Sequence, residues 1–170
     1  MDGLTGGVEP LSPVYPPTRL PALDSAKLVR ALQGAYNQGK RRKELLQLAA
    51  TRMRAAGSPY TGVYLYMLHG NDLLLEAFDG RPTEHTKIPV GTGICGRAVA
   101  ERRDINAPDV SAEPDYLACS VETRSELVVL IRRGDEILGQ VDIDSDVVSG
   151  FDATEEGAVK EVADALAALL

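Results

Sequence analysis

The sequence contains few of the residues that bind metals or form disulfides, with only two cysteines and two histidines among its 170 residues. The histidines, His69 and His85, show no metal-site spacing to each other or to the cysteines, so no metal site is expected. The N-terminus has neither the basic nor the apolar region of a secretory signal. Two cysteines without such a signal indicate a reducing compartment, so we expect a cytoplasmic protein.

Positive charge and long apolar runs are also scarce. The sequence has 18 lysines and arginines and 25 aspartates and glutamates, which gives a net charge of −7 at pH 7 and a pI near 4.9. This excess of acids argues against nucleic acid or an anionic membrane surface as a partner, because binding to either requires a large positively charged surface on the protein. The basic run 40–43 is therefore interpreted as the solvated start of a helix. Apolar runs such as 127–131 are far too short to span a bilayer.

The chain divides into an arm and one domain. Five of the ten prolines lie within residues 2–21, which show no hydrophobic period, so residues 1–22 are predicted to be a flexible arm. The remainder, residues 23–170, has the length of a single domain with a sizeable core.

Periodicity and turn residues predict the elements of this domain. A first helix should begin after Asp24 or Ser25, either of which can cap it. The last helix should be capped by Asp152, with Glu155 completing a capping box. Between them we expect a helix over 40–56, strands at 61–68, 73–78 and 86–90, a helix over 94–102, and strands at 126–133 and 137–144. This order predicts an α+β domain with a mainly antiparallel sheet.

The glycine loop 91–96, Gly-Thr-Gly-Ile-Cys-Gly, matches the dinucleotide-binding fingerprint in its letters. That fingerprint requires a βαβ unit in a parallel sheet, whereas the strands that follow here resemble a hairpin. The glycines are better explained by a tight turn that leads into a helix.

Two aspartates, Asp142 and Asp144, are spaced so that they point to the same face of one strand. If the site is even partly dry, the two charges raise one another's pKa, as in an acid–base site. The alternative is the solvent-exposed face of an edge strand, and the residues alone leave both interpretations open.

The cysteines lie in two different settings. Cys119 falls in a long connection, residues 107–123, and connections of that length are often functional. Cys95 falls in the first turn of a predicted helix, where unpaired N–H groups stabilise a thiolate.

From about Tyr60 to the C-terminus, the sequence resembles a GAF domain of the free methionine-(R)-sulfoxide reductase type. The resemblance rests on Ala118-Cys119, Ser125-Glu126-Leu-Val and Gly139-Gln-Val-Asp142-Ile-Asp144-Ser in this order. Further matching pieces are Gly62-Val-Tyr64, the segment 88–96 around the glycine loop, and Pro108-Asp-Val110.

The resemblance implies a fold and a set of roles. The fold would be a central, mainly antiparallel sheet with N- and C-terminal helices packed on one face, and the protein would be a homodimer. Cys119 would be the nucleophile, with Glu126, Asp142 and Asp144 as catalytic and substrate-binding acids. Tyr64 and Tyr60 would supply aromatic rings to the substrate pocket, Tyr60 standing where the family usually has tryptophan.

Three positions depart from the family pattern. His85 stands where the family usually has its resolving cysteine, which leaves Cys95 as the only internal candidate for that role. Pro114-Asp115-Tyr116 replaces a usual Pro-Gly-His, and Ser120 replaces a common aspartate. No bound cofactor is implied, but a thioredoxin-like or small thiol reductant is.

The resemblance therefore predicts thiol-dependent reduction of free methionine-(R)-sulfoxide to methionine, with Cys119 attacking the sulfoxide sulfur. The alternative is a non-catalytic GAF sensor for a small molecule or for redox state, in which Cys119 acts as a switch. A dimerisation module is compatible with either activity.

Overall fold

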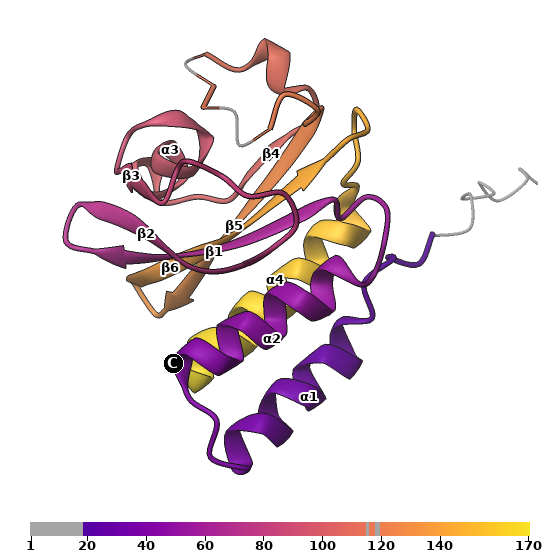
Figure 1. Ribbon diagram of the computed structural model, residues 1–170, viewed down its shortest axis with the longest axis vertical. Coiled ribbons are helices and arrows are strands. Elements are labelled where there is room, and N and C mark those ends of the chain that lie inside the picture. Colours follow the sequence, from indigo (N-terminus) through magenta and orange to yellow (C-terminus); the bar gives the residue numbers. More distant parts are fainter. Residues whose placement is uncertain (1–18, 115, 118–119) are drawn as a thin grey trace, which may run out of the picture.

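The computed structural model describes residues 19–114, 116–117 and 120–170. Its centre is a six-stranded sheet in the order β3-β2-β1-β6-β5-β4, in which every neighbouring pair is antiparallel (Figure 1). The strands are β1 (Gly62–His69), β2 (Asp72–Asp79), β3 (Lys87–Pro89), β4 (Ile105–Ala107), β5 (Ser125–Arg133) and β6 (Glu136–Ser145).

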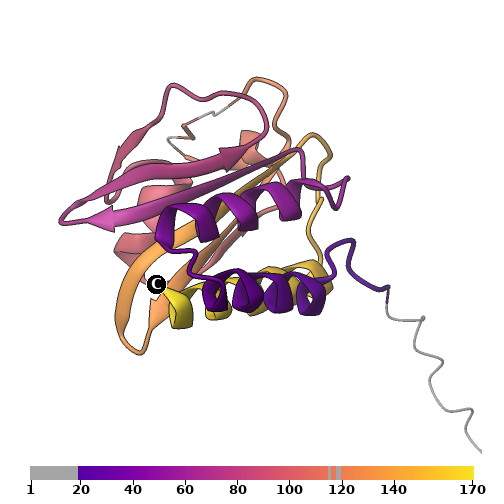
Figure 2. The same cartoon turned by 60° about the horizontal axis from the view of Figure 1, so that its bottom comes forward.

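Helices cover the two faces of the sheet unequally. On one face, α2 (Arg42–Arg54) and α4 (Ala153–Leu169) contact the strands, and α1 (Ser25–Asn37) packs on them from outside (Figures 1 and 2). On the other face lie the short helix α3 (Gly93–Glu101) and the 3-10 turn η1 (Val110–Ala112) (Figure 1). The predicted α+β arrangement, with an antiparallel sheet and terminal helices on one face, is confirmed.

The alternation along β1 separates two apolar cores. Val63, Leu65 and Met67 belong to the core under α1, α2 and α4, whereas Tyr64 and Tyr66 belong to the core under α3. Because successive side chains of a strand point to opposite faces, β1, β2, β5 and β6 contribute to both cores. The sheet is thus buried on both sides, and the α3 side carries the candidate site.

Helix caps follow the sequence prediction in part. The Asp24 carboxylate accepts from the Lys27 N–H at the start of α1, and that of Asp152 accepts from two N–H groups at the start of α4. The predicted capping box is wrong, because the Glu155 carboxylate accepts instead from the Tyr60 hydroxyl (2.7 Å) and the Ala22 N–H (2.6 Å). Glu155 therefore ties α4 to the segments before α1 and β1.

The glycine loop is a tight turn into α3, as predicted. Gly91 has a φ of +93°, a region that side chains other than glycine rarely adopt. A Cβ at Gly96 would lie 2.5 Å from the Pro89 carbonyl oxygen, so only glycine lets α3 approach the end of β3 this closely. Since the sheet is antiparallel, the setting of a dinucleotide fingerprint is absent from the described part of the chain.

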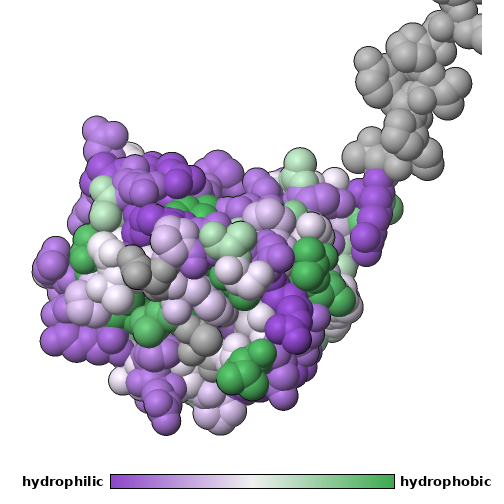
Figure 3. All heavy atoms as spheres, turned by 90° about the horizontal axis from the view of Figure 1, so that it is seen from above, coloured by the Kyte–Doolittle hydropathy of each residue, from purple (hydrophilic) through white to green (hydrophobic). Residues whose placement is uncertain are grey.

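On the side where the connection between η1 and β5 lies, the described residues form no broad apolar area. Seen from that side, the surface is mostly polar, with small separate apolar patches (Figure 3). Among the described residues, no helix combines the length and apolar character that crossing a bilayer requires.

Candidate functional site

Three acidic side chains gather on the α3 side of the neighbouring strands β5 and β6. Asp142 and Asp144 lie on β6, and Glu126 lies on β5 directly opposite Asp144. Their exposed fractions are only 0%, 2% and 3%, respectively. Since β6 is hydrogen-bonded to both β1 and β5, the edge-strand interpretation of the aspartates is wrong.

Cys95 completes this group from the opposite side. It lies in the first turn of α3, as predicted, and its Sγ is 3.9 Å from Oε1 of Glu126. One ligand atom each of Cys95, Glu126 and Asp142 lies within 4.8 Å of the other two, and all three residues are buried. We call Cys95, Glu126, Asp142 and Asp144 the acid pocket.

The acid pocket borders a cavity of about 10 Å³, which Cys95, Glu126 and Leu117 line together with Ile88 and the start of α3. This volume holds about one water molecule. The cavity is much smaller than an amino acid.

Burial dominates the electrostatics of the acids. It raises the pKa of Asp142 to about 6 and, together with the neighbouring Asp142 charge, raises that of Asp144 to about 8. Burial and the charges of both aspartates also raise the pKa of Glu126 well above its usual range. In the described part of the chain, no lysine or arginine forms an ion pair with these acids.

Several oxygens of the acids are unsatisfied. Both carboxylate oxygens of Asp142 and Oδ1 of Asp144 are buried without a hydrogen-bond partner. Glu126 and Cys95 are near enough to influence the pKa of Asp142, but neither makes a hydrogen bond of normal geometry to it. Buried polar atoms without partners are rare and costly, and they commonly mark functional sites.

The two predicted aromatic residues differ in position. Tyr64 lies on the α3 side, on β1, where its backbone is opposite Asp142, and its hydroxyl donates to the Arg81 carbonyl (2.7 Å). Tyr60 packs in the other core, against Phe151 and hydrogen-bonded to Glu155. The expectation that Tyr60 lines the pocket is therefore wrong, because it precedes β1 and its side chain packs on the α4 side.

Cys119, the predicted nucleophile, lies outside the described residues, and so does Ala118 before it. Described residues on both sides of Cys119 in the sequence contact the acid pocket or its cavity. Leu117, before it, lines the small cavity, and Thr123, after it, contacts Asp144. The Thr123 hydroxyl donates to Oδ2 of Asp144 at 3.2 Å.

Sequence reasoning missed Thr123 and a surface ion-pair group centred on Arg81. The Arg81 guanidinium donates to both oxygens of Asp146 (2.9 and 2.7 Å) and pairs with Glu122 at 2.7 Å. It thereby ties the β2–β3 connection to the segment before β5 and to the end of β6. No spacing in the sequence indicates this group, because its members are distant along the chain.

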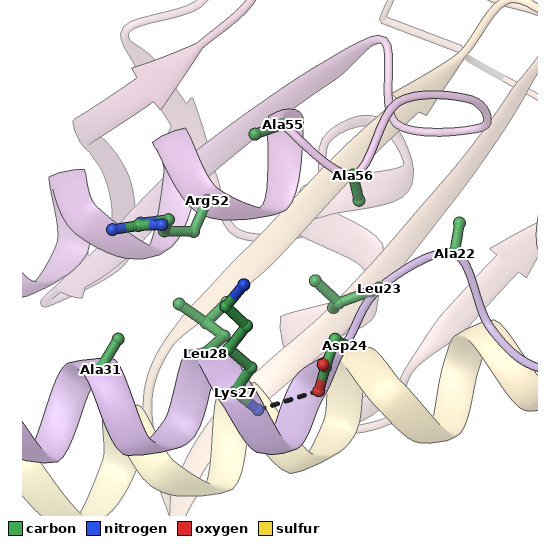
Figure 4. Close-up of a pocket in the computed structure, with 9 residues that line it drawn as sticks. All are labelled: Ala22, Leu23, Asp24, Lys27, Leu28, Ala31, Arg52, Ala55 and Ala56. Atoms are coloured by element: carbon green, nitrogen blue, oxygen red, sulfur yellow. Dashed lines mark hydrogen bonds between the residues drawn. The ribbon is translucent and has the colours of Figure 1, made fainter.

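A second cavity, of about 350 Å³, opens between α1 and α2 (Figure 4). Its walls are mostly alanine and leucine, with Lys27 and Arg52 as the cations. No residue of the acid pocket lines it, and it lies on the helix layer, across the sheet from α3. The predicted site and this groove are separate features.

Residues 42–170 match the family described as the GAF domain, which is most of the chain. The chain belongs to the GAF domain family. The matched region of this GAF domain begins at α2 and includes the whole sheet and the acid pocket.

Relatives of this GAF domain include reductases. It is 36% identical over 97 residues to GAF domain-containing protein A of Dictyostelium discoideum, covering 57% of this chain and 60% of that protein. It is 33% identical over 97 residues to free methionine-R-sulfoxide reductase of Escherichia coli, covering 57% of this chain and 58% of that enzyme. The alignments thus span about three-fifths of the length of these two relatives.

Among solved structures, this GAF domain is similar to the type II free methionine-R-sulfoxide reductase of Thermoplasma acidophilum. The TM-score is 0.72 and the identity 34%, with 84% of this chain and 94% of that one covered. The resemblance to this group of enzymes, first indicated by the sequence motifs, is confirmed.

Proposed function

We propose that this GAF domain reduces free methionine-(R)-sulfoxide to methionine, with Cys119 as the nucleophile. The observation that supports this most directly is a buried pocket of three carboxyl groups, which Leu117 and Thr123 both border. Two residues of chain span at most about 7 Å, so the position of Leu117 is compatible with a reacting Cys119 at this pocket. Relatives that carry the reductase name add independent support.

The acids would supply the proton that the reaction consumes. A sulfoxide oxygen leaves only when it is protonated, and a carboxylic acid is a suitable donor. Three carboxyl groups this close together and this deeply buried cannot all be ionised, so at least one keeps a proton near neutral pH. Asp144 is our candidate for the donor because both burial and the adjacent Asp142 charge favour its protonated form.

The remaining negative charge would select the substrate. A free amino acid carries an ammonium group, whereas a methionine sulfoxide residue within a polypeptide does not. Asp142, whose pKa of about 6 leaves it mostly ionised near neutral pH, would carry the charge that binds that ammonium, and Glu126 beside it would accept a hydrogen bond from it. The pocket would thereby favour the free amino acid over the protein-bound residue.

The chemistry then proceeds in balanced steps. The Cys119 thiolate bonds to the substrate sulfur, and the protonated oxygen leaves as water or hydroxide. Attack of water on the Cys119 sulfur breaks the new S–S bond and releases methionine. The net result is a two-electron reduction of the substrate sulfur and oxidation of Cys119 to a sulfenic acid.

Recycling requires a thiol to condense with that sulfenic acid, releasing water and forming a disulfide. His85 cannot serve, and in this structure its carbonyl accepts from the Tyr66 hydroxyl (2.7 Å). Cys95, which lines the same small cavity as Leu117, is our candidate for the resolving thiol. A thioredoxin-like protein or a small thiol would then reduce the disulfide, and we propose that the enzyme works as a homodimer in the cytoplasm.

The experiment is a turnover assay on free methionine-(R)-sulfoxide with excess dithiothreitol, comparing the wild type with Cys119→Ser and Cys95→Ser. We expect methionine release by the wild type, none by Cys119→Ser, and retained turnover by Cys95→Ser, since dithiothreitol replaces the internal thiol. The (S)-sulfoxide and a methionine sulfoxide peptide serve as substrate controls.

Binding of the sulfoxide without methionine release by the wild type would instead favour the GAF sensor. Equal turnover by the wild type and Cys119→Ser would exclude Cys119 as the nucleophile.

A further inference from the structure

We propose that Cys95, Glu126 and Asp142 form a binding site for one thiophilic divalent cation of the zinc class. The sequence predicted no metal site, because neither histidine has a suitable spacing. The site inferred here uses no histidine, and its three ligands come from α3, β5 and β6. Only the folded chain brings them together.

The spacing of the ligand atoms suits a small tetrahedral ion. Zinc–sulfur bonds of about 2.3 Å and zinc–oxygen bonds of about 2.1 Å place two ligands about 3.6 Å apart on a tetrahedron. Cys95 Sγ and Glu126 Oε1 are 3.9 Å apart, and the Asp142 oxygen lies within 4.8 Å of both. Movements of a few tenths of an ångström for the first pair, and about an ångström for Asp142, close the site.

A second, independent observation points to a ligand. Asp142 is 0% exposed, yet neither of its oxygens has a hydrogen-bond partner, and one of them lies within 4.8 Å of the ligand atoms of Cys95 and Glu126. A buried carboxylate in this situation loses its hydration without compensation. A bound cation would satisfy these oxygens and allow Glu126 and Asp142 to be ionised together.

The donor set selects the kind of ion. A thiolate is a soft ligand that zinc and cadmium bind well, whereas magnesium and calcium prefer oxygen ligands. Calcium also takes six to eight oxygens, and the adjoining cavity of about 10 Å³ has room for about one water. Three protein ligands and one water complete the tetrahedron of a zinc-like ion.

A metal ion bound at this site would regulate the reductase activity, an inference that rests on the proposed function. The ion would engage Glu126 and Asp142, which are the acids proposed to bind the substrate ammonium. Zinc should therefore inhibit the reductase in competition with methionine sulfoxide, and a chelator should restore activity.

The test measures metal binding directly on the full chain, without using activity. Chelator-treated, reduced protein is titrated with zinc by equilibrium dialysis, and with cadmium by the ultraviolet charge-transfer band of a cadmium–thiolate bond. We expect one ion per chain, with binding weakened by at least about tenfold in Cys95→Ser and in Asp142→Asn. The matched controls are Cys119→Ser, which removes the other thiol, and Asp109→Asn, which removes a half-buried acid outside the acid pocket. Both should bind as the wild type does.

Absence of binding, or binding lost in Cys119→Ser and retained in Cys95→Ser, would overturn the proposal. Urea unfolding of each variant identifies any that fail to fold. Asp142→Asn is the variant most expected to fold, because asparagine has almost the same shape as aspartate and removes a buried carboxylate. If the protein binds zinc but never reduces the sulfoxide, the metal site stands and the reductase proposal fails. If it reduces the sulfoxide but binds no zinc, the reductase proposal stands and the metal-site proposal fails.

Discussion

Replacing Asp144 with asparagine should stabilise the protein at alkaline pH and have a much smaller effect in acid. Asp144 is 2% exposed on a central strand, and burial together with the Asp142 charge raises its pKa to about 8. Asparagine has almost the same shape and still offers an oxygen to the Thr123 hydroxyl, which donates to Asp144 in the wild type. The substitution therefore removes the Asp144 charge with little change of shape.

The size of the effect follows from proton linkage. An acid whose pKa is raised by folding binds protons more tightly in the native state, so stability falls as pH rises from the unfolded pKa towards the native one. Between pH 5 and pH 8, the unfolded carboxyl is ionised while native Asp144 is largely protonated. Three pH units at 1.36 kcal/mol each give a loss of about 4 kcal/mol in the wild type that the asparagine variant avoids.

Urea unfolding at pH 5 and pH 8, with a chelator present, measures this difference. We expect the stability advantage of Asp144→Asn over the wild type to grow by about 4 kcal/mol across this range. The control is Asp146→Asn, two residues along the chain. The Arg81 hydrogen bonds lower the pKa of Asp146, which is thus ionised in both states above pH 5, so its effect should not vary with pH. If the effect of Asp144→Asn were equally independent of pH, the pKa of Asp144 would not be raised by burial, and the proposed role of Asp144 as a protonated acid would fail.

Two further substitutions test the packing around the site. Gly96→Ala should destabilise the protein by about 1–3 kcal/mol in urea unfolding, because its Cβ would lie 2.5 Å from the Pro89 carbonyl oxygen. Gly34→Ala on α1, where a Cβ meets nothing within 4 Å, should instead stabilise by up to about 1 kcal/mol, and equal losses in both would refute this reasoning. Tyr60→Phe should cost about 1–3 kcal/mol, because buried Glu155 loses its hydroxyl donor. It should leave KM for the sulfoxide unchanged. A large rise in KM would show that Tyr60 contacts the substrate.

Local rules predicted much of this fold from the sequence. The caps at Asp24 and Asp152 rest on side-chain chemistry within one turn, and the opposite faces of Val63 and Tyr64 follow from the period of a strand. The same period predicted that Asp142 and Asp144 would be neighbours. These features depend on residues close together in the chain.

The burial of the acids could not be predicted in the same way. It depends on β1 pairing with β6, which leaves β6 in the middle of the sheet, and this pairing joins segments about 80 residues apart. Glu155 shows the same limit, since a tertiary partner, Tyr60, outcompetes the local capping box. The meeting of Cys95 with Glu126 likewise arises only because α3 packs across β5.

The measurement that tests the central claim most directly is a single turnover without external reductant. Reduced protein is mixed with free methionine-(R)-sulfoxide, methionine release is quantified, and the oxidised cysteine is located by mass spectrometry of trapped peptides. The account predicts one methionine per chain, with oxidation at Cys119 as a sulfenic acid or as a disulfide with Cys95. Methionine release with Cys119 still reduced, or no release with the substrate bound, would contradict it.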